Sequence, residues 1–220
     1  GWDYAKRQLV PFSEYVPGKY SATSLWRWMR KAIPAVMVQI EPGRNDTPYL
    51  LRNKLFRRQG VEIHTPICFE GTFARRVREM VLAGKSGSQK ILINLSNDGW
   101  FVYTARPGSP QQTPEHRLHF AHSVFRAVET RTPVVRVVNT GISGWIDSTG
   151  RVRKTMEKPG RSGRNDTIAP QSEVYHVMPG GHETTLYLRC GEWFAVAVVG
   201  GCGLLALITL LRSRNKRNPL

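Results

Sequence analysis

The chain has 220 residues, of which 40% are apolar and 22% are charged, a composition that excludes a disordered or low-complexity protein. Its 32 basic and 16 acidic residues give a formal net charge of +16, which favours an anionic partner, either nucleic acid or a membrane. Because no zinc-finger spacing and no RNA-recognition signature accompanies the basic residues, we expect no nucleic acid. Three widely spaced cysteines, Cys68, Cys190 and Cys202, are too few for a disulfide framework.

Apolar patterns along the chain predict an α/β domain with a mixed sheet. In chain order they indicate a strand at 61–67, a helix at 72–83, a strand at 90–95, a helix from Pro114, a strand at 134–138, a hairpin formed by 142–147 and 151–156, and a last strand at 173–178. The stretches 101–113 and 158–170 are rich in polar, Pro or Gly residues and predict loops. In the helix from Pro114 we expect Leu118, Ala121, Phe125 and Val128 to face the core.

The run 193–211 predicts a transmembrane helix. It has 19 residues without a charge, close to the roughly 20 that cross a bilayer core, and a buried core helix rarely reaches this length without a polar residue. Arg212, Arg214, Lys216 and Arg217 follow the run, so the positive-inside rule places the tail in the cytoplasm and the preceding domain on the other side. We therefore divide the chain into a domain at 1–190, a membrane helix at 191–212 and a basic tail at 213–220.

The start of the chain contains no signal peptide, because residues 1–7 are polar and basic and no apolar stretch follows them. A domain outside the cytoplasm needs an export signal. We therefore expect that segments preceding residue 1 belong to the protein.

Cys68 follows the strand at 61–67 and precedes the helix at 72–83. A thiol at a helix amino terminus gains thiolate character, and free backbone N–H groups there stabilise an oxyanion. The alternative is a buried structural cysteine. Glu70, two residues on, either assists the thiol or only favours the start of the helix.

Two further segments carry candidate site residues. Lys6 and Glu14 flank the apolar stretch 9–12, and a lysine beside a thiol stabilises an oxyanion, although most lysines are solvated surface residues. Asn97, Trp100 and Phe101 follow the strand at 90–95, and ligands bind at the carboxyl ends of strands in α/β sheets. The alternative is a plain turn with Trp100 packed in the core.

These segments together resemble the nitrilase superfamily, and most closely its apolipoprotein N-acyltransferase branch. The resemblance rests on KRQLVPFSEYVPG at 6–18, PICFE at 66–70, NLSNDGWF at 94–101, the stretch 115–147 and TTLYLRCGEW at 184–193. It implies an α-β-β-α sandwich, incomplete at its amino terminus and followed by one membrane helix. It also implies a bacterial inner-membrane location, with the catalytic domain on the periplasmic side.

The resemblance also implies roles for individual residues. Cys68 is the nucleophile that forms a thioester, Lys6 stabilises the tetrahedral intermediate, Glu14 and Glu70 are additional site glutamates, and Trp100, with Phe101 and Asn97, lies near the substrate. The acyl donor is a phospholipid, and the acceptor is the amino-terminal amine of a lipid-modified cysteine on a lipoprotein. The family's general-base glutamate matches no position in this sequence.

We expect neither a cofactor nor a metal, and the sequence leaves the oligomeric state open. Two other functions remain. One is a carbon–nitrogen hydrolase that uses Cys68 with water, which the span at 193–211 disfavours. The other is an inactive membrane-tethered fragment without a general base.

Overall fold

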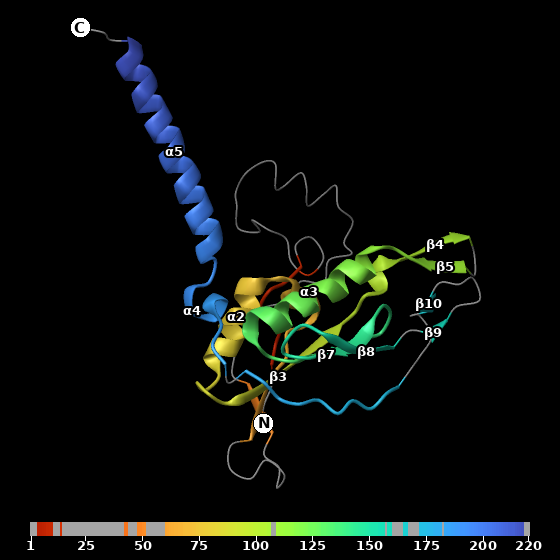
Figure 1. Cartoon of the computed structure of the whole chain (residues 1–220). Helices are drawn as coiled ribbons and strands as arrows, with labels where there is room; N and C mark the ends of the chain where they lie inside the picture. Colours follow the sequence, from red (N-terminus) through yellow and green to blue (C-terminus); the bar gives the residue numbers. More distant parts are fainter. Residues whose placement is uncertain are drawn as a thin grey trace.

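The computed structural model describes residues 4–10, 14, 42–43, 48–51, 60–106, 109–156, 158–159, 165–166, 172–181 and 183–217 (Figure 1). Part of the expected motif at 6–18, most of the expected loop at 158–170 and the last three residues of the basic tail lie outside these ranges.

A six-stranded mixed sheet forms the centre of the described residues. Its strand order is β1-β2-β3-β6-β7-β8, with bounds Tyr49–Leu51, Val61–His64, Gln89–Ser96, Val134–Val138, Ser143–Ile146 and Val152–Met156. The central strands β2, β3 and β6 are parallel, whereas β1 and the β7–β8 hairpin pair antiparallel at the two edges. The predicted α/β class, the mixed sheet and the hairpin are confirmed.

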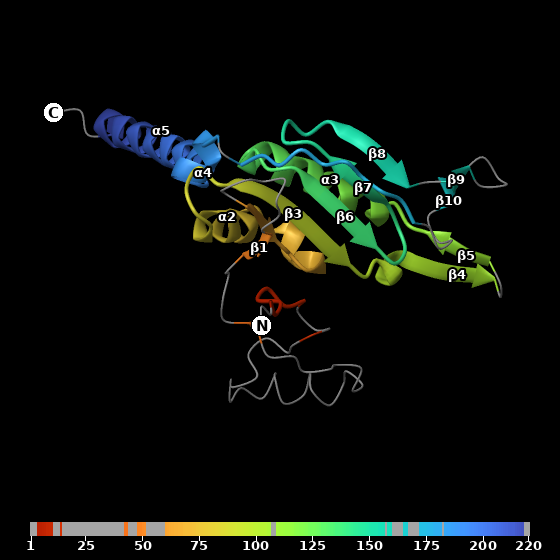
Figure 2. The same cartoon turned by 90° about the horizontal axis from the view of Figure 1, so that it is seen from below.

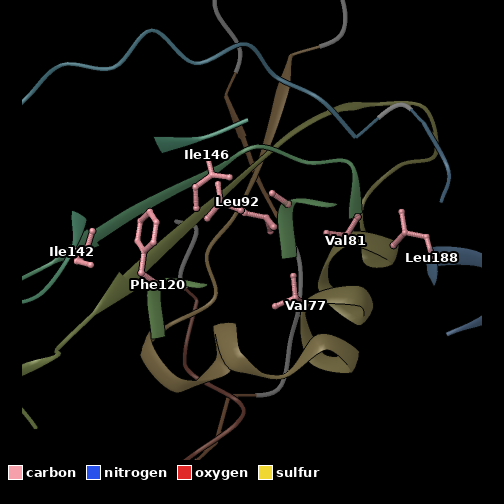
Figure 3. Close-up of a cluster of buried hydrophobic side chains, with 9 residues drawn as sticks. Val77, Val81, Leu92, Phe120, Ile142, Ile146 and Leu188 are labelled. Carbon is pink, nitrogen blue, oxygen red and sulfur yellow. The ribbon is translucent and has the colours of Figure 1, made fainter. Parts of the chain in front are cut away.

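Helices α2 (Ala74–Ala83) and α3 (Glu115–Thr130) lie side by side on one face of this sheet (Figures 1 and 2). The core lies between the two layers and consists of Val77, Val81, Leu92, Phe120, Ala127, Val134, Ile142, Ile146 and Leu188 (Figure 3). Alternate residues of β3 are buried, and Leu95, which points to the opposite face, is 48% exposed. The described residues thus supply one sheet of the expected sandwich with its helical layer.

The predicted inward face of α3 was wrong. Leu118, Phe125 and Val128 are exposed, and the buried residues are His116, His119, Phe120, Ser123, Arg126, Ala127 and Thr130. The hydrophobic pattern predicted the wrong face because several polar side chains on the buried face of α3 have hydrogen-bond partners within the protein. Arg126, for example, donates to the Thr72 carbonyl and to Glu129.

Predictions for three less regular segments also differ from the structure. The expected loop at 101–113 contains a second hairpin, in which β4 (Val102–Arg106) pairs antiparallel with β5 (Ser109–Gln112). The expected strand at 173–178 is not a strand; after it, Gly180 forms a single bridge with Lys90. Two short strands, β9 (Lys158–Pro159) and β10 (Asn165–Asp166), pair within the expected loop at 158–170.

The chain leaves the sheet through α4 (Leu186–Cys190) and enters the long helix α5 (Trp193–Arg217). Arg78 of α2 donates to the carbonyls of Tyr187, Leu188 and Arg189 and so fixes the end of α4 on the domain. In α5, Trp193–Arg212 has a mean hydropathy of 2.5 and is not buried against the domain, from which α5 projects (Figure 1). The length and composition of this helix support membrane association.

Candidate active site

Cys68 begins the short 3₁₀ helix η2 (Cys68–Thr72), four residues after the end of β2. Its φ of +51° lies in the left-handed region, which costs a non-glycine residue about 1–3 kcal/mol and persists only where the surroundings hold it. The preceding Ile67 forms a parallel bridge with Leu95 at the end of β3. The half-buried thiol is therefore presented on a turn at the carboxyl ends of the parallel strands.

Glu70 joins this turn to the amino-terminal segment. Its carboxylate is fully buried and accepts hydrogen bonds from the backbone N–H groups of Arg7, Gln8 and Ile67, at 2.6, 2.9 and 2.9 Å. The Tyr4 hydroxyl also donates to it, at 2.9 Å. Burial, together with the negative charge of Glu70, raises the pKa of Tyr4 and keeps that hydroxyl protonated as a donor.

Lys6 lies on the segment that Glu70 holds. It is buried, and its Nζ lies 2.8 and 2.7 Å from the two carboxylate oxygens of Glu14. Glu14 also accepts a hydrogen bond from the N–H of Val10, at 2.8 Å. Lys6 is therefore not a solvated surface lysine. Hydrogen bonds connect Glu14 to Lys6, and Glu70 connects the neighbouring Arg7 to the Cys68 turn.

The NLSNDGWF segment reaches the thiol through Asn97. The Cys68 Sγ lies 4.0 Å from the Asn97 carbonyl oxygen, and the Asn97 side chain accepts hydrogen bonds from Gly99 N and Asn139 Nδ2. Trp100, in the 3₁₀ helix η3 (Gly99–Phe101), is 67% exposed and is not a core residue. Phe101 packs edge-on against His116 and His119 of α3.

A buried polar network lies behind the thiol and was not predicted from the sequence. Asn94 of β3 donates to the carbonyls of Pro66 and Cys68, and Arg136 of β6 donates to both Asn94 and Asp98. Burial opposes ionisation of Asp98, but the contact with His119 and the charge of Arg136 prevail and hold its pKa at about 2. The sequence did contain a signal for this network, because the apolar stretches KILINL and VVRVV each contain one of its polar residues, Asn94 and Arg136.

The arrangement defines a class: an α/β domain with a thiol at a strand-to-helix turn, and a buried lysine paired with a glutamate on the segment that Glu70 holds to that turn, followed by a helix of membrane length. The chain is 33% identical to an apolipoprotein N-acyltransferase of Geobacter metallireducens over 94% of its own length and 33% of that protein. It is 31% identical to the enzyme of that name from Thermotoga maritima, over 98% of the chain and 35% of that protein. The resemblance to apolipoprotein N-acyltransferases is confirmed over this part of their length.

The chain spans about one third of the length of these curated relatives. No protein-family model matches it. Among solved structures, a carbon-nitrogen hydrolase from Helicobacter pylori G27 matches with a TM-score of 0.39 and 13% identity, covering 53% of this chain and 41% of that one. Saccharomyces cerevisiae Nit3, a member of branch 10 of the nitrilase superfamily, matches with a TM-score of 0.37 and 16% identity, covering 53% and 38%.

Proposed function

We propose that the chain carries the nucleophile of an acyltransferase that moves a fatty acyl chain from a phospholipid to the amino-terminal amine of a lipid-modified lipoprotein cysteine. The observation that carries the proposal is the connection of the Lys6–Glu14 pair to the Cys68 turn through Glu70. The names of the relatives supply the type of reaction.

In the first step, the Cys68 sulfur attacks the ester carbonyl of the phospholipid. An S–C bond forms, the ester C–O bond breaks, and the lysophospholipid leaves with the proton of the thiol. The Lys6 ammonium stabilises the negative charge on the carbonyl oxygen, as preorganised donors do in acyl transfer. The proton is relayed by the family's general-base glutamate, which lies upstream of the lysine motif in the family and matches no position in this sequence.

In the second step, the lipoprotein amine attacks the thioester carbonyl. A C–N bond forms, the C–S bond breaks, and a proton from the amine returns to the sulfur. Such a covalent intermediate splits one transfer into two easier steps and gives ping-pong kinetics. Trp100, Phe101 and Asn97 are proposed to lie beside the acyl chain or the acceptor.

Both substrates are membrane lipids, which fits a domain tethered by α5. We place the protein in the bacterial inner membrane, with the domain on the periplasmic side and the tail in the cytoplasm. The basic residues after the apolar span, Arg212 and Arg214 among them, support this orientation.

The test is a transfer assay in membranes that contain the longest form of the protein its gene encodes. A phospholipid with a labelled acyl chain and a diacylglyceryl lipopeptide are supplied, and mass spectrometry detects the products. We expect the acyl chain on the lipopeptide amine, and no product with Cys68→Ala. Release of labelled free fatty acid without acylated peptide would instead support the hydrolase, and no turnover at all would support an inactive fragment.

A further inference from the structure

The orientation of the Asn94 side chain is determined by Arg136. A guanidinium only donates hydrogen bonds, so the amide atom that faces it is the acceptor Oδ1. The donor end, Nδ2, therefore faces the turn, where it lies 2.8 Å from the Pro66 carbonyl oxygen and 3.3 Å from that of Cys68. One asparagine thus holds the strained Cys68 turn against β3.

Close packing supports this contact. A Cβ atom at Gly71 would lie 3.0 Å from Asn94 Nδ2, so the glycine leaves the amide room to approach the turn. Both partners are buried, with exposed fractions of 2% for Asn94 and 1% for Arg136.

The second terminal nitrogen of Arg136 reaches the other side of the thiol. It lies 2.6 Å from Asp98 Oδ2, and Ser96 Oγ donates to Asp98 Oδ1 at 2.6 Å. Asp98 directly follows Asn97, whose carbonyl oxygen is the contact of the Cys68 sulfur. One guanidinium therefore connects the backbone that carries the thiol with the segment that the thiol touches.

We infer that Arg136 is a positioning residue for the nucleophile, acting on Cys68 through Asn94 on one side and through Asp98 on the other. This inference rests on the proposed role of Cys68. A lysine at 136 would keep the positive charge beside Asp98, but its single terminal nitrogen cannot reproduce the two-armed guanidinium. Since a carboxylate is the stronger partner, the lysine would pair with Asp98 and release Asn94.

The experiment is a double-mutant cycle of Arg136→Lys and Asn94→Leu in the membrane-bound protein. Two rates are measured: alkylation of Cys68 by iodoacetamide, resolved from Cys190 and Cys202 by peptide mass spectrometry, and acyl-thioester formation. We expect each single variant to change the Cys68 alkylation rate by at least threefold and to slow thioester formation about tenfold. The double variant should be no worse than either single variant, because both substitutions break the same link.

Arg78→Lys is the matched control, since it also weakens the guanidinium contacts of a partly buried arginine but lies at the α2–α4 junction. It should leave both rates within twofold of the wild type. Asn94→Asp provides a second route if Arg136→Lys does not fold, because it keeps the acceptor for Arg136 and loses the donor to the turn, and we expect the same losses.

Additive losses in the cycle, or wild-type Cys68 alkylation in Arg136→Lys or Asn94→Asp, would overturn the inference. Alkylation needs no acyl donor. If the alkylation pattern holds while no variant and no wild-type protein forms a thioester, the positioning role stands and the proposed transferase fails.

Discussion

Among single residues, Glu70 holds the amino-terminal segment and the Cys68 turn together. Its buried carboxylate accepts three backbone N–H groups and one hydroxyl, drawn from two segments about sixty residues apart in sequence. Hydrogen bonds to a buried charged acceptor are stronger than neutral ones, and donors left unpaired there are costly. The position of Lys6 relative to Cys68 therefore depends on a residue that need not react.

We predict that Glu70→Gln destabilises the protein by roughly 3 kcal/mol and slows acyl-thioester formation at least tenfold, because an amide presents an NH₂ group to some of these donors. Thermal unfolding in detergent and the rate of adduct formation measure the two effects. Glu183→Gln is the control: its side chain is 75% exposed and pairs with the exposed Arg131 away from the site, so we expect a change below about 0.5 kcal/mol. A Glu70→Gln protein as stable as the control would contradict this role.

Asp98 predicts a pH dependence of stability. Its pKa falls from 3.8 in the unfolded chain to about 2 in the folded one, so the ionised form favours the fold. This contribution, on the order of 2 kcal/mol, is present above pH 4 and is lost as the pH falls towards 2. Comparing unfolding of the wild type and Asp98→Asn between pH 6 and 2 measures it. The difference between them should shrink with acid, and a difference that stays constant would contradict the assignment.

The candidate site could be predicted from the sequence only as a set of motifs. Cys68, Lys6, Glu14 and Glu70 were identified through their order and spacing in a family pattern, and the structure brings their segments together. Asn94 and Arg136 were not identified, because each looks like an isolated polar residue in an apolar strand. Their contact is between neighbouring parallel strands, β3 and β6, whose register no local pattern reveals.

At the scale of elements, β6 was predicted with its observed bounds and β3 to within one residue at each end, since continuous apolar runs are typical of buried parallel strands. The face of α3 was not predicted correctly. A hydrophobic pattern assumes that polar side chains face water, whereas His119 and Arg126 of α3 are buried and hydrogen-bond to Asp98 and to the Thr72 carbonyl. The β4–β5 hairpin was missed because its polar residues resemble those of a loop.

The buried face of α3 can be tested by comparing two phenylalanines on the same helix. Phe120 is 8% exposed and lies in the core, whereas Phe125 on the same helix is 58% exposed. Phe120→Ala should cost about 3 kcal/mol or more through lost burial and the cavity left behind, and Phe125→Ala less than about 1 kcal/mol. Thermal unfolding of the two variants compares them. Equal losses, or a larger loss for Phe125→Ala, would restore the face expected from hydrophobicity.

At the scale of the whole molecule, the domain and the apolar helix α5 are joined by α4, which Arg78 holds against α2. None of the apolar window of α5 is buried against the residues that the structure describes, and its length and composition support membrane association. The net charge of +16 favours a domain that lies close to an anionic membrane surface.

Two native cysteines test this arrangement. Cys190 ends α4 just before the apolar span, and Cys202 lies inside it. In bacterial cells with a permeable outer membrane, a membrane-impermeant maleimide should label Cys190 from the periplasmic side and leave Cys202 unlabelled until detergent is added. Labelling of Cys202 in intact membranes would contradict the span, and labelling of Cys190 only after the inner membrane is opened would contradict the orientation.

Mass spectrometry of the Cys68 peptide, after incubation of the membrane-bound protein with phospholipid, shows whether Cys68 is the nucleophile. We expect a fatty acyl thioester on Cys68 that disappears when a lipopeptide amine is added, and no adduct in Cys68→Ala. An unmodified Cys68, or an acyl group on another residue that persists in Cys68→Ala, would contradict the assignment of the nucleophile.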